Sequence, residues 1–156
     1  MKTKTMTVEQ RTRLDFEFRI LKRYVPTFKM LVSNGDIFVE GVVTTQSGRE
    51  YLGRLILPDY YPDEEPAVLL VHPRPLPMRN GGQNFDSLGS SGSFCLRGPD
   101  ADGNLVLCAF TSWDLSKSCS IAIAKIALWC EGYENYLKTG ETISVYLSRL
   151  AGELER

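Results

Sequence analysis

Cys95 is the residue of this chain whose neighbours best suit chemistry. It lies in the segment Gly-Ser-Phe-Cys-Leu-Arg-Gly, residues 92–98, between small residues on one side and an arginine and a glycine on the other. A cysteine thiolate is a strong nucleophile when it is at least partly exposed. The two glycines would let another polypeptide approach the backbone closely. Three interpretations of Cys95 therefore compete: a nucleophile, a metal ligand or a small buried apolar residue.

The other cysteines help to choose among these interpretations. Cys108, Cys119 and Cys130 are too widely spaced for a Cys-x-x-Cys metal knuckle, and the only histidine, His72, lies far upstream. Cys119 and Cys130 lie on one face of an apolar helical pattern, so we predict that they are core residues. Cys108 is flanked by apolar residues, which predicts a buried place for it as well. We therefore favour Cys95 as a nucleophile and expect neither a metal nor another cofactor.

Composition and charge set limits on the class of protein. The 156 residues are 43% hydrophobic and 24% charged, which is typical of one globular domain. The net charge of −1 and the absence of a basic run predict no nucleic-acid partner. No apolar run approaches the roughly 20 residues of a membrane span, and we recognise no signal peptide. The sequence thus predicts a cytoplasmic protein without a membrane partner.

The first half of the chain predicts a helix followed by a sheet. Thr7 and Gln10 form a capping box that begins a helix, and Pro26 should end it near Tyr24. Four strands follow, and short turns between the first three predict an antiparallel meander. The predicted strands are residues 28–32, 36–45, 50–58 and 67–73.

The second half predicts a long loop and two helices. Residues 74–110 have no clear periodicity and are rich in glycine, proline and serine, so this loop is either mobile or functional. Residues 120–137 predict a buried helix that Gly140 closes, and residues 141–155 predict an amphipathic one. The order of elements predicts a single α+β domain over residues 1–156.

This order of elements resembles the ubiquitin-conjugating enzyme (UBC-like) fold over nearly the whole chain. Three local features carry the resemblance. The segment around Cys95 is similar to the one around the nucleophile of that family, and Trp113 resembles the tryptophan between the nucleophile and the long helix. The third feature is a set of prolines that end one strand and begin the next, namely Pro58, Tyr61-Pro62, Pro66 and His72-Pro73.

The chain departs from the eukaryotic members at the asparagine that serves their nucleophile. Arg74 follows His72-Pro73 in place of that asparagine, and about twenty residues separate this motif from Cys95. Ser87 stands at the corresponding offset before the cysteine, and the segment between Cys95 and Trp113 is longer than usual. The resemblance is therefore to a divergent, prokaryotic type of member.

The resemblance implies that Cys95 carries the C-terminal acyl group of a donor protein as a thioester and passes it to an amine. Arg97 is a candidate for stabilising the thiolate, because it is a cation two residues away. Asn84, Ser87 or backbone amides of the loop are candidates to support the oxyanion, with Asn80 further away.

The same resemblance requires help for the attacking lysine of the target protein. Asp114, directly after Trp113, is the nearest candidate for positioning that lysine, and Asp100 and Asp102 are alternatives. His72 could act as a base, but the resemblance gives it a structural place at the end of a strand.

Short conjugating enzymes of this kind resemble those of bacterial antiphage operons, which implies two classes of acyl donor. One is a cGAS-like nucleotidyltransferase, as in CBASS defence systems, and the other is a bacterial ubiquitin-like protein. The sequence has no activating-enzyme domain, so we expect such an enzyme to act in trans, or none to be needed if the system is a reduced one. The competing interpretation is a catalytically inactive UBC-like or RWD-like interaction module. The retained Cys95 argues against that module, whereas the departure at the asparagine favours it.

Overall fold

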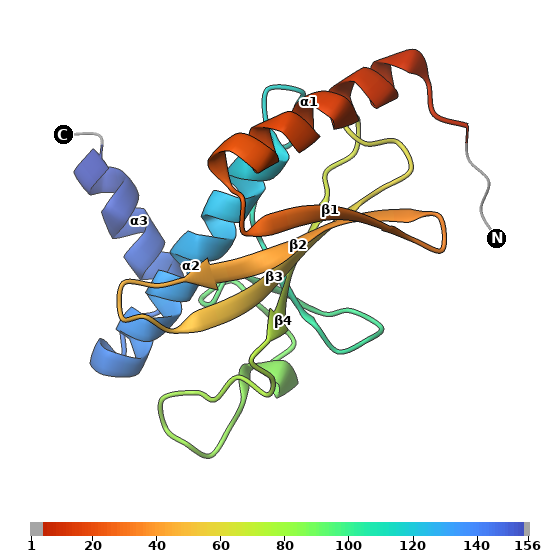
Figure 1. Ribbon diagram of the computed structural model, residues 1–156. Helices are drawn as coiled ribbons and strands as arrows, with labels where there is room; N and C mark the ends of the chain where they lie inside the picture. Colours follow the sequence, from red (N-terminus) through yellow and green to blue (C-terminus); the bar gives the residue numbers. More distant parts are fainter. Residues whose placement is uncertain (1–4, 155–156) are drawn as a thin grey trace.

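Residues 5–154 form one antiparallel sheet with three α-helices and one 3-10 helix (Figure 1). The computed structural model describes residues 5–154. Within them the elements are α1 (Val8–Tyr24), β1 (Phe28–Ser33), β2 (Asp36–Thr44), β3 (Glu50–Leu57), β4 (Ala67–His72), the 3-10 helix η1 (Phe85–Ser87), β5 (Ser90–Ser91), β6 (Leu96–Pro99), β7 (Leu105–Leu107), α2 (Cys119–Thr139) and α3 (Ile143–Leu154). The predicted α+β class is confirmed.

The sheet contains the predicted meander and extends beyond it. The strand order is β1-β2-β3-β4-β7-β6-β5, and all neighbouring strands are antiparallel. The prediction of four strands was therefore too low, because residues 74–110 add three more. These strands have two to four residues each, which is too short for an alternating pattern to be visible in the sequence.

Helix α1 begins and ends as predicted. The Thr7 hydroxyl accepts from the Gln10 amide, and the Gln10 side chain accepts from the Thr7 amide, which completes the capping box. A buried carboxylate then docks the helix. Glu17 accepts hydrogen bonds from the Tyr61 hydroxyl and from the Cys119 amide at 2.9 Å. One side chain thus joins α1 to the proline-rich crossover after β3 and to the first residue of α2.

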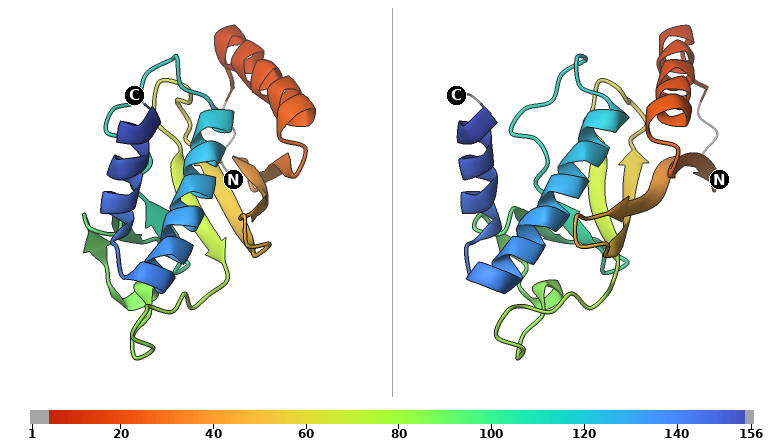
Figure 2. Two further views of the ribbon diagram at one scale, coloured as in Figure 1. Left: turned by 90° about the vertical axis from the view of Figure 1, so that its left-hand side faces the viewer. Right: turned by 60° about the vertical axis from the view of Figure 1, so that its left-hand side comes forward.

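Helix α2 crosses one face of the sheet, and α3 lies beside it (Figure 2). Its apolar residues fill the core, and Cys119 and Cys130 are buried as predicted. Gly140 ends the helix with a φ of 81°, a conformation that glycine adopts without strain. None of the helices in residues 5–154 has both the length and the apolar character needed to cross a bilayer.

A second buried carboxylate fixes the C-terminal half of α2. Glu134 accepts hydrogen bonds from the hydroxyls of Thr45 at 2.6 Å, Ser47 at 2.5 Å and Tyr51 at 2.7 Å. Burial raises the pKa of this carboxyl, but the three donors and Arg49 together hold the pKa below its ordinary value. The helix is therefore held to the β2–β3 hairpin and cannot slide along the sheet without losing these bonds.

Candidate functional site

Cys95 is the last residue of the turn that joins β5 to β6. The two strands pair through Ser91 and Leu96, so residues 92–95 form the connecting loop. Cys95 has a φ of 53°, in the left-handed region that non-glycine residues rarely adopt. This conformation costs a non-glycine residue about 1–2 kcal/mol. Such strain is concentrated at functional sites, where the surrounding structure must hold it in place.

All four carbonyl groups of this turn accept hydrogen bonds. The Gly92 carbonyl accepts from the Cys95 amide at 3.3 Å, and the Cys95 carbonyl accepts from the Cys108 amide at 2.9 Å. Two helices hold the carbonyls between them: Ser144 of α3 donates its amide to Ser93 at 3.0 Å, and the Trp129 indole of α2 donates to Phe94 at 2.8 Å. Both C-terminal helices therefore fix the backbone around Cys95.

The amide groups of the same turn are in a different situation. Within residues 5–154, no acceptor forms a hydrogen bond with the N–H groups of Ser93 and Phe94. The turn thus has its acceptors occupied and keeps donors available. Backbone donors that are fixed in advance are what an oxyanion beside the Cys95 sulfur would need.

An aromatic cluster supports the turn from below. The Phe94 ring contacts the rings of Phe85 and Tyr136, with centroids 4.9 and 5.0 Å away. Phe85 belongs to η1 and is completely buried, and it also contacts the ring of Trp129. The Leu76 amide donates to the Asp86 carboxylate at 2.8 Å, which ties the start of the loop to η1. The loop before Cys95, which the sequence predicted to be either mobile or functional, therefore packs onto α2 through these aromatic rings.

The Cys95 thiol is half-buried, and its pKa is raised. Burial is the main cause, because it disfavours the charged form, and the nearby Cys108 sulfur adds to the effect. The prediction that Cys108 is buried was wrong, because its side chain is exposed. Leu105 and Leu107 of β7 are buried, so the next residue in the alternation, Cys108, faces outward. The two-residue period of a strand at residues 105–107 is the signal in the sequence that predicts this exposure.

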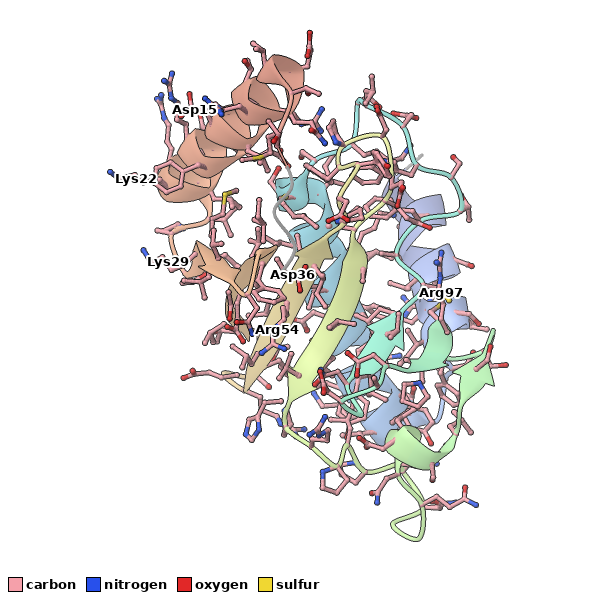
Figure 3. The ribbon with its side chains drawn as sticks, turned by 90° about the vertical axis from the view of Figure 1, so that its right-hand side faces the viewer. Asp15, Lys22, Lys29, Asp36, Arg54 and Arg97 are labelled. Carbon is pink, nitrogen blue, oxygen red and sulfur yellow. The ribbon has the colours of Figure 1, made fainter. Side chains whose placement is uncertain are left out.

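Arg97 interacts with Cys108 and Glu65. Its guanidinium donates to the Glu65 carboxylate at 3.3 Å and to the Phe110 carbonyl at 3.4 Å. Partial burial lowers the pKa of Arg97, but the neighbouring Cys108 and Glu65 outweigh it and raise the pKa overall. Figure 3 shows the Arg97 side chain projecting from β6. With the pKa of Cys95 raised, this arrangement does not support the expected stabilisation of the Cys95 thiolate by Arg97.

A β-bulge explains the direction of Arg97. Leu96 pairs with Leu107 and Gly98 pairs with Val106, so Arg97 is the additional residue between two successive pairs. A bulge residue leaves the regular alternation and points its side chain in a new direction. Although Arg97 is only two residues from Cys95 in the sequence, the bulge prevents this spacing from bringing the two side chains together.

The predicted oxyanion candidates Asn84 and Ser87 lie at the η1 turn. The Ser87 hydroxyl donates to the Asn84 carbonyl at 2.9 Å, within the η1 turn. Asn84 precedes η1, and its side chain makes no capping hydrogen bond there. Among the described residues no hydrogen bond joins either side chain to Cys95, and the support of Asn84 or Ser87 for an oxyanion stays a prediction.

The predicted acidic residue is held by its own loop. The Asp114 carboxylate accepts from the Ser116 hydroxyl, from the Ser116 amide at 2.8 Å and from the Lys117 ammonium at 2.9 Å. These contacts, the Ser116 hydroxyl foremost, lower the pKa of Asp114 to about 2. Asp100 instead accepts amides of its own turn, from Asp102 and Asn104. A role of Asp114 in positioning a lysine stays a prediction.

Two pockets flank Cys108. One has a volume of about 220 Å³ and lies between the end of β7, α2 and α3, with Leu128, Trp129 and Leu147 in its wall. The other has a volume of about 190 Å³ and contains Glu65 and Arg97. In the part of the chain that the structure describes, no three His, Cys, Asp or Glu residues are grouped as metal ligands. Comparisons of this chain with protein-family models, with curated proteins and with solved structures found no match.

Proposed function

We propose that this protein is a ubiquitin-conjugating-like acyltransferase of UBC-like fold in which Cys95 forms the thioester. The observation that carries the proposal is the turn at residues 92–95. It holds a half-buried cysteine in a left-handed conformation, and all four of its carbonyl groups accept hydrogen bonds, one from the turn itself and three from α2, α3 and the residue after β7. A cysteine that only filled space in the core would not need this arrangement. The fixed backbone and the available N–H groups suit acyl transfer.

The chemistry follows from these groups. The Cys95 thiolate attacks the carbonyl carbon at the C-terminus of the donor, and the N–H groups of Ser93 and Phe94 are available to the oxyanion that develops. Collapse of this intermediate expels the previous acyl carrier and leaves a thioester on Cys95. An amine of the target then attacks the thioester, loses its proton and expels the Cys95 thiolate.

The raised pKa of Cys95 has two opposing effects on this reaction. It reduces the fraction of thiolate at neutral pH, which slows the first step. It also makes each thiolate intrinsically more nucleophilic and a poorer leaving group. The thioester would therefore both form and transfer its acyl group more slowly than at a cysteine of ordinary pKa.

The proposed donor is a bacterial ubiquitin-like protein or a cGAS-like nucleotidyltransferase, acting with an activating enzyme in trans in antiphage defence. A flexible C-terminal tail is the common feature of both donors. The two pockets described above are the candidate places for such a tail, because Cys108, whose amide donates to the Cys95 carbonyl, lines one of them and Arg97 lines the other.

A preformed thioester provides a test that bypasses the activating enzyme. Each candidate donor is prepared with a C-terminal mercaptoethanesulfonate thioester and incubated with the wild type, Cys95→Ser and Cys108→Ser. The wild type and Cys108→Ser should form an adduct that dithiothreitol removes. Cys95→Ser should form an oxyester that resists dithiothreitol and is cleaved by alkali.

Either of two results would refute the proposal. One is that neither donor forms an adduct with the wild type, and the other is that the adduct is attached to a residue other than Cys95. The first result would favour the inactive interaction module, and the second would assign the acyl group to another nucleophile. The variant Cys108→Ser is the matched control, because it removes the neighbouring thiol and keeps the turn sequence intact.

A further inference from the structure

The strand register places Cys95 and Cys108 opposite each other. Leu96 pairs with Leu107 in the antiparallel β6–β7 ladder, so the next positions on that side are Cys95 and Cys108. The Cys108 amide donates to the Cys95 carbonyl at 2.9 Å, which confirms that the two backbones are adjacent there. Opposed antiparallel residues have Cα atoms about 4.5–5.5 Å apart, and disulfides join residues whose Cα atoms are about 4.4–6.8 Å apart. The two residues therefore lie at a backbone separation that a disulfide can span, and the Cys108 side chain is close enough to the Cys95 thiol to act on it electrostatically.

The environments of the two thiols differ in a way that assigns roles. Cys108 is exposed, and its side chain lies beside the Arg97 guanidinium. Cys95 is half-buried in its turn, whereas Cys119 and Cys130 are buried in the core. An oxidant in solution therefore reaches Cys108 first, and the partner nearest to the oxidised sulfur is Cys95.

We infer that Cys95 and Cys108 form a reversible disulfide when the protein meets a peroxide, with Cys108 as the residue attacked first. The Cys108 thiolate displaces hydroxide from hydrogen peroxide and becomes a sulfenic acid. The Cys95 thiol loses its proton, and its sulfur attacks the Cys108 sulfur and expels a second hydroxide. In sum, two thiols and one peroxide give one disulfide and two waters, and a thiol reductant reverses the change.

The disulfide would make Cys95 unavailable to an acyl donor. This consequence rests on the proposed function, but formation of the disulfide does not. It would also protect Cys95 from irreversible oxidation to the sulfinic acid, since a sulfur in a disulfide is not attacked further by the same route. Cys108 would thus be a modification site that switches the chain off and preserves its nucleophile.

The sequence allows a direct test by peptide mapping. Cleavage after lysine and arginine places the four cysteines in separate peptides, with Cys95 in residues 80–97 and Cys108 in residues 98–117. The full chain is treated with hydrogen peroxide at low protein concentration, and free thiols are counted after denaturation. We expect two of the four thiols to be lost, a mass decrease of two hydrogens and one linked pair containing these two peptides.

The variant Cys108→Ser is the control. It should form no intramolecular disulfide, and its Cys95 should progress to sulfenic and sulfinic acids under the same treatment. The inference is overturned if all four wild-type thiols survive, if the linked peptides contain Cys119 or Cys130, or if only disulfide-linked dimers form. These results are independent of any acyl donor, so they leave the proposed conjugation activity to its own assay.

Discussion

The indole of Trp129 should control how firmly the Cys95 turn is held. Replacing Trp129 with Phe keeps an aromatic ring in the cluster and removes the N–H that donates to the Phe94 carbonyl at 2.8 Å. A buried carbonyl that loses its donor costs about 1–3 kcal/mol. If the substitution lowers the free energy of local opening of the turn by about 1–2 kcal/mol, the population of the open turn rises about 5- to 30-fold.

Amide hydrogen exchange measures that opening directly. The Cys108 amide donates to the Cys95 carbonyl and the Ser144 amide donates to the Ser93 carbonyl, so both amides report on the turn. In Trp129→Phe their exchange should accelerate about 5- to 30-fold, in proportion to the open population. Amides in the centre of β3 should change only as much as the global free energy of unfolding does.

Trp113→Phe is the matched control for this experiment. Its indole also donates to a backbone carbonyl, that of Pro62, at 2.7 Å. This variant should lower the global free energy of unfolding by a similar amount, about 1–3 kcal/mol, without the selective acceleration at Cys108 and Ser144. Equal acceleration of these two amides in both variants would refute the reasoning, because it would mean that the turn opens only when the whole domain unfolds.

Two further predictions concern the turn and its neighbouring loop. Cys95→Gly should be more stable to urea than Cys95→Ala by about 0.5–1 kcal/mol. Glycine avoids the cost of the left-handed conformation, about 1–2 kcal/mol, but loses about 0.5–1 kcal/mol of chain entropy on folding. A glycine variant less stable than the alanine variant would contradict the strain at the Cys95 φ of 53°. The charged form of Asp114 is stabilised in the folded protein, so the wild type should have a larger free energy of unfolding than Asp114→Asn. This difference should be complete above about pH 4 and disappear as the pH falls through about 2. A difference in the free energy of unfolding that stays constant down to pH 2 in acid denaturation would contradict this prediction.

The parts of the fold that the sequence predicted are those with long, regular patterns. The helix after Thr7 has a capping box and a proline limit, and α2 is a long apolar run closed by Gly140, so their ends were predicted within one or two residues. The strands β1 to β4 have six to nine residues each, which is enough to show turns and apolar runs. Local propensity is sufficient for elements of this length.

The missed features depend on contacts between distant segments. The strands β5, β6 and β7 form because Phe85 and Leu76 anchor the loop in the core, and no short stretch of sequence contains that information. The direction of Arg97 follows from a bulge, and the exposure of Cys108 follows from the phase of β7. Cys95 itself could be singled out from its glycine and serine neighbours, but the four carbonyl partners of its turn come from α2, α3, the turn and the residue after β7.

The shared acceptor Glu17 makes the docking of three segments thermodynamically interdependent. The Tyr61 hydroxyl and the Cys119 amide both require its carboxylate, and the Arg13 guanidinium lies 3.9 Å from it. Removing α1 would leave two buried donors without an acceptor in the proline-rich crossover and at the start of α2. The first helix is thus part of the cooperative folding unit rather than an appendage, and a fragment that begins at β1 would not retain the packing that positions α2 beneath the Cys95 turn.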